Sequence, residues 1–129
     1  ANNAVKHNVV IKVIRRLFMF LPMLAYVIAM REQAEAAMFA AELDPNYEPS
    51  LDLHGLSVDL AKHELEAFLN HAFMRRALAV KIIHGRGQDK LKMLVEKTLK
   101  THPIVDAWRG ASDMRGAGAV TYAALSRRP

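Results

Sequence analysis

The chain of 129 residues is 52% hydrophobic and 24% charged, and it contains no cysteine. This length suits a single domain with its own core, and the composition excludes a disordered chain. The lack of cysteine excludes disulfides, thiolate nucleophiles and Cys-ligated metal sites, and it favours a cytoplasmic location.

The net charge of +5 is concentrated towards the end of the chain. Residues 1–83 contain nine Lys/Arg and nine Asp/Glu, whereas residues 84–129 contain nine Lys/Arg and four Asp/Glu. A basic excess of this kind favours an anionic partner such as nucleic acid, although an ordinary solvated face has the same composition.

Residues 1–49 are predicted to form an N-terminal helical extension and a linker. Val9–Met30 is strongly apolar, with three basic residues in its first half and Pro22 in its second. Its uninterrupted apolar part, Leu17–Met30, is shorter than the roughly 20 residues needed to cross a bilayer. A buried or dimer-forming helix, kinked or broken near Pro22, is therefore favoured over a membrane segment or a signal sequence. Residues 31–43 are rich in good helix formers, and two prolines end this region.

Residues 50–129 are predicted to form one α/β domain, in which strands and helices follow in the order βαβαββ. The predicted ranges are Leu51–His54, Ser57–Ala77, Ala79–Ile83, Asp89–Lys100, Ile104–Arg109 and Ala119–Leu125. Apolar residues at helical spacing indicate the helices, and short apolar runs indicate the strands. The first strand–helix–strand unit makes its two strands parallel. The predicted fold is a two-layer βαβαββ sandwich with a four-stranded mixed sheet.

Both predicted parallel strands end in a histidine that is followed by glycine. Because ligands collect at the carboxyl ends of such strands, we expect His54 and His84 to share one site. Asp52 lies two residues before His54, where its carboxylate can orient the imidazole or raise its pKa. Asp52, His54 and His84 are the predicted catalytic residues. A capping histidine beside a structural aspartate is the alternative.

The run from His84 to Gly87 predicts an anion-binding loop. Its two glycines allow the backbone to approach a ligand, and successive amide hydrogens can form an anion nest. The loop leads into a helix N-terminus, which favours phosphate, and Arg86 can hold a phosphate bidentately. A plain glycine turn is the alternative. The predicted nucleic-acid-binding residues are Gly85, Arg86, Gly87, Lys90, Lys92 and Arg115.

These motifs resemble those of the Smr (small MutS-related) domain family. The resemblance covers about residues 50–125 and rests on Leu51–Gly55, on His84–Gly87 and on the closing Gly116–Val120. It implies a βαβαββ sandwich similar to the C-terminal domain of a bacterial translation initiation factor. It also implies an endonuclease that nicks DNA or cuts messenger RNA on ribosomes. Ala117 departs from the paired glycines that are usual in the closing motif.

The predicted function is an endonuclease, with RNA slightly favoured over DNA. On RNA, one of His54 and His84 would take the 2′-hydroxyl proton and the other would protonate the leaving 5′-oxygen, with no metal required. On DNA, where water must attack, a divalent ion such as Mg or Mn, held by Asp52 and His54, is expected. No dedicated metal-binding cluster is predicted.

Two other functions stay open. The same loop would serve a non-catalytic module that binds nucleic acid or the ribosome. The chain would also suit a protein-interaction domain that forms a homodimer through its N-terminal apolar segment. A membrane partner is not expected.

Overall fold

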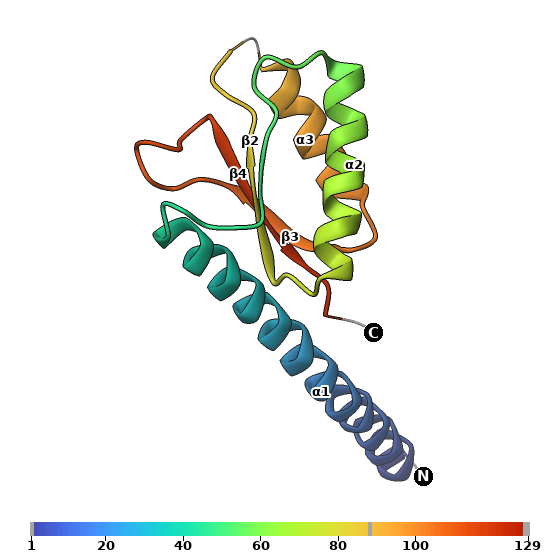
Figure 1. Ribbon diagram of the computed structural model, residues 1–129. Helices are drawn as coiled ribbons and strands as arrows, with labels where there is room; N and C mark the ends of the chain where they lie inside the picture. The colour runs from blue at the N-terminus through green and yellow to red at the C-terminus, as the bar shows by residue number, and fades with distance from the viewer. Residues whose placement is uncertain (1, 88, 128–129) are drawn as a thin grey trace. The chain divides into compact units, whose positions relative to one another are not determined.

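The computed structural model describes residues 2–87 and 89–127. Within these residues, three helices and four strands follow the predicted order (Figure 1). They are α1 (Asn2–Leu43), β1 (Ser50–Asp52), α2 (Val58–Met74), β2 (Ala79–Ile83), α3 (Lys90–Thr101), β3 (Val105–Gly110) and β4 (Val120–Leu125). The chain divides into two compact units between Glu32 and Gln33. The predicted α/β class, its element order and the N-terminal helix are confirmed.

The four strands form a mixed sheet in the order β1-β2-β4-β3. Strands β1 and β2 are parallel, with Asp52 opposite Ile83, and α2 connects them. Strand β4 is antiparallel to both β2 and β3. The predicted four-stranded mixed sheet is confirmed. Because β1 and β2 are parallel and end side by side, the residues that follow them emerge at the same end of the sheet.

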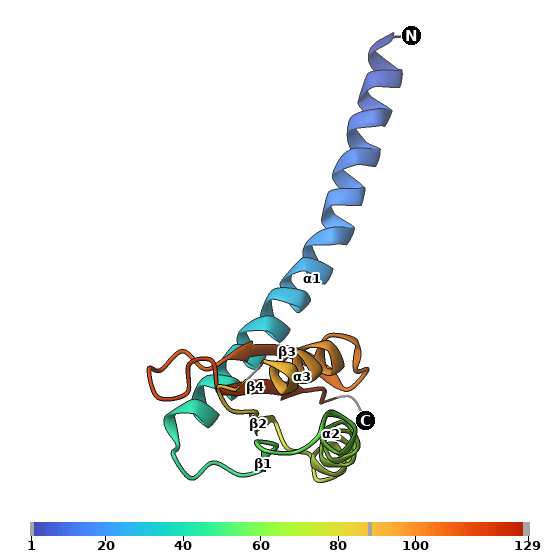
Figure 2. The ribbon, with the colours of Figure 1, turned by 90° about the horizontal axis from the view of Figure 1, so that it is seen from above.

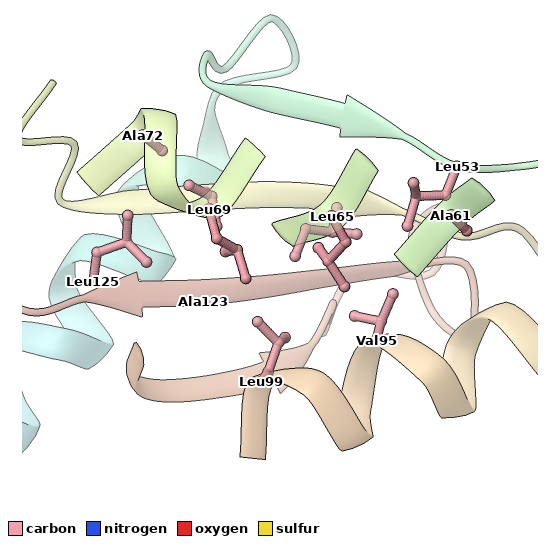
Figure 3. Close-up of a cluster of buried hydrophobic side chains, with 11 residues drawn as sticks. Leu53, Ala61, Leu65, Leu69, Ala72, Val95, Leu99, Ala123 and Leu125 are labelled. Atoms are coloured by element: carbon pink, nitrogen blue, oxygen red, sulfur yellow. The ribbon is translucent and has the colours of Figure 1, made fainter. Parts of the chain in front are cut away.

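Helices α2 and α3 cover one face of the sheet, where most of the core lies (Figure 3). Their apolar residues recur every three or four positions, which places them on one side of each helix. Leu65 and Leu69 of α2 and Val95 and Leu99 of α3 are almost completely buried, and they pack with Ile82 of β2. The predicted apolar faces of both helices are therefore present.

The last part of α1 packs on the opposite face of the sheet, as the teal end of that helix shows in Figure 2. Ala34, Met38 and Ala41 are buried there against Ala79, Tyr122 and Ala124. Their spacing of four and three residues makes one helix face, and small side chains let helix and sheet approach closely. The predicted division into residues 1–49 and 50–129 remains a prediction, while residues 33–43 belong to the compact unit that contains the sheet.

The first unit consists of the earlier part of α1. The helix continues through Pro22, and its large apolar side chains from Val5 to Ile28 are exposed. The helix is therefore not broken at Pro22 and is not buried within the chain, while its role in forming a dimer stays a prediction. One proline removes a single N–H donor, and the turns on either side keep their own hydrogen bonds. By length and composition, α1 could cross a membrane.

Candidate functional site

The two histidine motifs meet in one groove at the carboxyl ends of β1 and β2. The groove has a volume of about 530 Å³ and contains residues from both motifs and from the first turns of α2 and α3. Figure 1 shows that the loops after β1 and β2 lie at the end of the sheet where α2 and α3 begin. The approach is close, since a Cβ placed on Gly85 would lie 3.4 Å from the Cβ of His54.

A tight turn after β1 presents His54 to solvent. The Leu53 N–H donates to the Ile83 carbonyl at 2.7 Å, which extends the parallel pairing by one residue. The Leu56 N–H then donates back to the Leu53 carbonyl, and Gly55 has a φ of +78°, a conformation that suits glycine. His54 therefore lies on the turn rather than on the strand, and 72% of its side chain is exposed.

Asp52 and His54 form a hydrogen-bonded pair. Oδ1 of Asp52 lies 2.7 Å from Nδ1 of His54 and also accepts the His54 backbone N–H at 3.0 Å. Burial by itself raises the pKa of Asp52, but these hydrogen bonds and the nearby imidazole together lower it by more. The pKa of Asp52 is therefore below its ordinary value. An ionised carboxylate only accepts, so in the neutral imidazole Nδ1 carries the proton and Nε2 has the lone pair. The predicted orientation of His54 by Asp52 is present.

His84 has different surroundings, because it is only 4% exposed and both ring nitrogens have partners. Nδ1 lies 3.1 Å from the Gly85 carbonyl, and Nε2 lies 2.9 Å from Oγ1 of Thr121. A carbonyl only accepts, so Nδ1 carries a proton and Nε2 accepts from the Thr121 hydroxyl. Burial lowers the pKa of His84, which keeps the ring neutral. This placement argues against His84 as a proton donor or acceptor for substrate and favours a role in supporting the loop.

The glycine loop after β2 is shaped by β4 and by the loop before it. The backbone N–H groups of His84 and Gly85 both donate to the Ala119 carbonyl, so neither is free for the predicted anion nest. Gly85 has a φ of +80°, which a residue with a side chain rarely adopts. The loop is therefore a hydrogen-bonded turn that requires glycine at position 85.

Arg86 lines the groove and is exposed, and its side chain also bonds to the loop before β4. Its Nε donates to the Ala117 carbonyl at 3.1 Å, and its Nη2 donates to the carbonyls of Met114 and Arg115 at 3.2 and 2.7 Å. These contacts use Nε and Nη2, so Arg86 ties the glycine loop to the β3–β4 loop while it also lines the groove. The Arg115 side chain is exposed on that same loop.

Two lysines and two helix N-termini give the groove its positive character. Lys90 and Lys92 contribute to its lining from the first turn of α3, and Ser57 and Val58 contribute from the start of α2. The partial positive charge of a helix N-terminus adds to that of the lysines, so the groove suits a phosphate. Asp89 also borders the groove and offsets part of this charge. The predicted residues Gly87, Lys90 and Lys92 thus lie beside His54.

Sequence reasoning missed two parts of this site. Thr121 fixes the His84 ring, and its signal is a polar residue inside an otherwise apolar strand. The carbonyl acceptors of Arg86 lie in the closing Gly116–Val120 motif and just before it, so that motif contributes through its backbone. Both parts become visible only when β2 is paired with β4.

A metal ion would find few ready ligands in this groove. Among residues 2–87 and 89–127, no group of three or more His, Asp or Glu side chains is arranged to hold one. Asp52 and His54 are the two that could contribute, and Oδ1 of Asp52 is already bonded to His54. An ion at this position would take its remaining ligands from water and from substrate phosphate.

The fold and the groove define a small α/β domain that presents an Asp-His pair and a lysine-lined groove at its strand ends. The chain belongs to the Smr domain family, because the Smr domain model matches residues 51–126. This confirms the resemblance seen in the motifs. Among solved structures, it is similar to the Smr domain of Thermus thermophilus MutS2, with a TM-score of 0.58 and 29% identity over 62% of this chain and 98% of that one. It is also similar to YdaL, a stand-alone small MutS-related protein from Escherichia coli, with a TM-score of 0.56 and 27% identity over 60% of this chain and 64% of that one.

Among curated proteins, the chain resembles much longer ones. It is 37% identical over 75 residues to the endonuclease MutS2 of Solidesulfovibrio magneticus, and 37% identical over 76 residues to that of Aquifex aeolicus. These matches cover 58% and 59% of this chain but 10% of each relative. The chain therefore spans about a tenth of the length of these relatives and matches their Smr part.

Proposed function

We propose that this chain binds nucleic acid in the groove beside His54 and cleaves a phosphodiester bond there, with RNA as the favoured substrate. The observation that carries the proposal is the solvent-facing imidazole of His54, which is oriented by an ionised Asp52 and lies next to a basic hollow. Membership of the Smr family and the name of the endonuclease relatives support a nuclease-related role.

His54 would act as the general base on RNA. Its Nε2 takes the proton of the 2′-hydroxyl, the 2′-oxygen attacks phosphorus, and the bond from phosphorus to the 5′-oxygen breaks. The leaving oxygen takes a proton from water, which reaches the groove because His54 is exposed, and the imidazolium returns its proton to solvent. The products are a cyclic phosphate and a 5′-hydroxyl. The ionised Asp52 stabilises the imidazolium while it carries the extra proton.

Lys90, Lys92 and the starts of α2 and α3 would hold the phosphate. They supply positive charge around the groove, so they favour the additional negative charge that forms on phosphorus oxygens during attack. The lack of a side chain at Gly85 allows the two loops to approach each other, because a Cβ there would already contact the His54 Cβ.

The test uses end-labelled RNA and DNA of the same sequence, single-stranded and duplex, in the presence of EDTA. We expect cleavage of RNA with cyclic phosphate ends. His54→Ala should lower the rate by about 100-fold or more, which is the usual contribution of a general base. His63→Ala is the matched control, because His63 is an exposed histidine of α2 outside the groove. Equal cleavage by His54→Ala and the control would refute the assignment of His54.

A second candidate is a module that binds nucleic acid without cleaving it. The burial of His84 favours this candidate, since the predicted partner for His54 in acid–base catalysis is bonded within the protein. The module predicts that wild-type protein leaves every substrate intact. It also predicts that replacing both Lys90 and Lys92 by Gln weakens binding and makes affinity less dependent on salt, with the slope falling by about one for each phosphate that a lysine no longer neutralises.

A further inference from the structure

Within the first unit of the chain, the helix from Leu17 to Met30 has an apolar surface on all sides. Between Arg16 and Arg31, α1 contains no charged residue. Ten large apolar side chains in this stretch are exposed, and they are Leu17, Phe18, Met19, Phe20, Leu21, Met23, Leu24, Tyr26, Val27 and Ile28. Since successive residues turn by about 100° around a helix, this set covers its whole circumference.

We propose that α1 anchors this chain in a phospholipid bilayer, with Leu17–Met30 in the hydrocarbon core. A helix that is apolar on all sides suits an environment that is apolar on all sides. A second copy of the chain fits less well, because two paired helices cover one seam on each other and leave the outer faces in water. The continuous helix through Pro22 also suits a membrane, where proline within helices is tolerated.

The charged residues near the apolar stretch agree with this placement. Lys12, Arg15 and Arg16 precede it, and Arg31 follows it. At about 1.5 Å per residue, the stretch is about 21 Å long, compared with about 30 Å for a hydrocarbon core. Long arginine side chains that reach the headgroups and a local thinning of the bilayer make up this difference. The basic residues also favour lipids with anionic headgroups.

The experiment is flotation of the whole 129-residue chain with vesicles of phosphatidylcholine and a minority of phosphatidylglycerol. The wild-type protein should float with the vesicles and remain bound in concentrated NaCl, since apolar insertion does not depend on charge screening. Leu21→Lys combined with Leu24→Lys should lower the vesicle-bound fraction by more than about 100-fold, because each lysine at the centre of the core is strongly disfavoured. The matched control is Asn3→Lys combined with Asn8→Lys, which adds the same charge to the same helix outside the apolar stretch.

Four results would overturn the anchor. The wild-type protein could remain unbound, or it could be released by salt, which would indicate adsorption by charge alone. It could also form a dimer of defined mass without lipid or detergent, which would identify a second copy as the partner. Expression in cells could also yield only a membrane-free chain whose mass lacks the apolar stretch, which would identify a cleaved leader. Fluorescence of Trp108, in β3, checks that both lysine variants keep the folded sheet.

Discussion

The carboxylate of Glu42 fastens the end of α1 to the sheet, and its removal should cost about 3 kcal/mol. Glu42 is 6% exposed and accepts hydrogen bonds from Arg109 Nη1 at 2.8 Å, from the Ser112 and Asp113 backbone N–H groups and from the Ser112 hydroxyl. Burial by itself raises the pKa of Glu42, but the Arg109 guanidinium and these hydrogen bonds lower it to about 2. Against an ordinary value of 4.5, at about 1.4 kcal/mol per pH unit, this corresponds to about 3 kcal/mol of stability at neutral pH.

Urea denaturation followed by the fluorescence of Trp108 measures this effect. Glu42→Gln should lower the free energy of unfolding at neutral pH by up to about 3 kcal/mol, because the amide cannot offset the Arg109 charge. Glu35→Gln is a closely matched control. Glu35 lies on the same helix and pairs with the same Arg109 at 3.3 Å, but its side chain is 59% exposed. An exposed pair contributes at most about 1 kcal/mol.

The pH dependence of the free energy of unfolding measures the contribution of the Glu42 carboxylate a second time. The folded-state pKa of Glu42 is lowered, so its contribution is complete above pH 4.5 and is lost as the pH falls towards about 2. The Glu42→Gln variant should lose less stability over this range than wild type does. Two results would contradict this role of the Glu42 carboxylate. One is an equal loss of unfolding free energy in Glu42→Gln and Glu35→Gln. The other is a loss of stability at acid pH in Glu42→Gln that equals that of wild type.

Three further predictions concern the groove. Burial lowers the pKa of His84 in the folded protein, so the free energy of unfolding should fall as the pH drops below the ordinary value of 6.5. Thr121→Val should lower the free energy of unfolding by about 1–3 kcal/mol at neutral pH, because it leaves Nε2 of His84 without its partner. Urea denaturation at several pH values measures both effects. Gly85→Ala should lower the free energy of unfolding by about 1–2 kcal/mol, because the positive φ of this position is strained for any residue with a Cβ atom. A urea titration that matches wild type would contradict this. Arg86→Lys should remove the hydrogen bonds that hold the β3–β4 loop, so limited digestion with trypsin should cut faster after Arg115. An unchanged rate of cutting there would show that other contacts hold the loop.

Local sequence patterns were sufficient for most of the fold because the elements here obey local rules. Ser57 caps α2 by accepting from the Leu60 N–H, as its position before an apolar helical pattern predicts. The parallel pairing of β1 and β2 follows from the helix between them. The packing of Ala34 and Met38 on the sheet was missed, because an alanine-rich helix with scattered acids has the composition of an exposed one.

The candidate site was predictable in position but not in the state of its histidines. Two strands that end together bring His54 and His84 to one edge, and the motif spacing contains that information. Whether an imidazole is free depends on its partners, and those of His84 come from Thr121, which pairing of β2 with β4 brings near. No periodicity within 84–87 indicates that contact. The acceptors of Arg86 are backbone carbonyls, which have no signature in side-chain chemistry.

The two motifs therefore make different contributions to one groove. In the proposed function, the motif after β1 would supply the chemistry, since His54 is exposed and its Nδ1 is held by Asp52. The motif after β2 supplies shape, since His84 and Arg86 use their polar atoms to fix two loops against each other. If the proposed substrate binds in the groove, a loop fixed in this way would keep its phosphate at a constant distance from Nε2 of His54, as general-base catalysis requires. On this argument, substitutions after β2 should change affinity and geometry together, whereas substitutions of His54 should leave binding intact and remove only the chemical step.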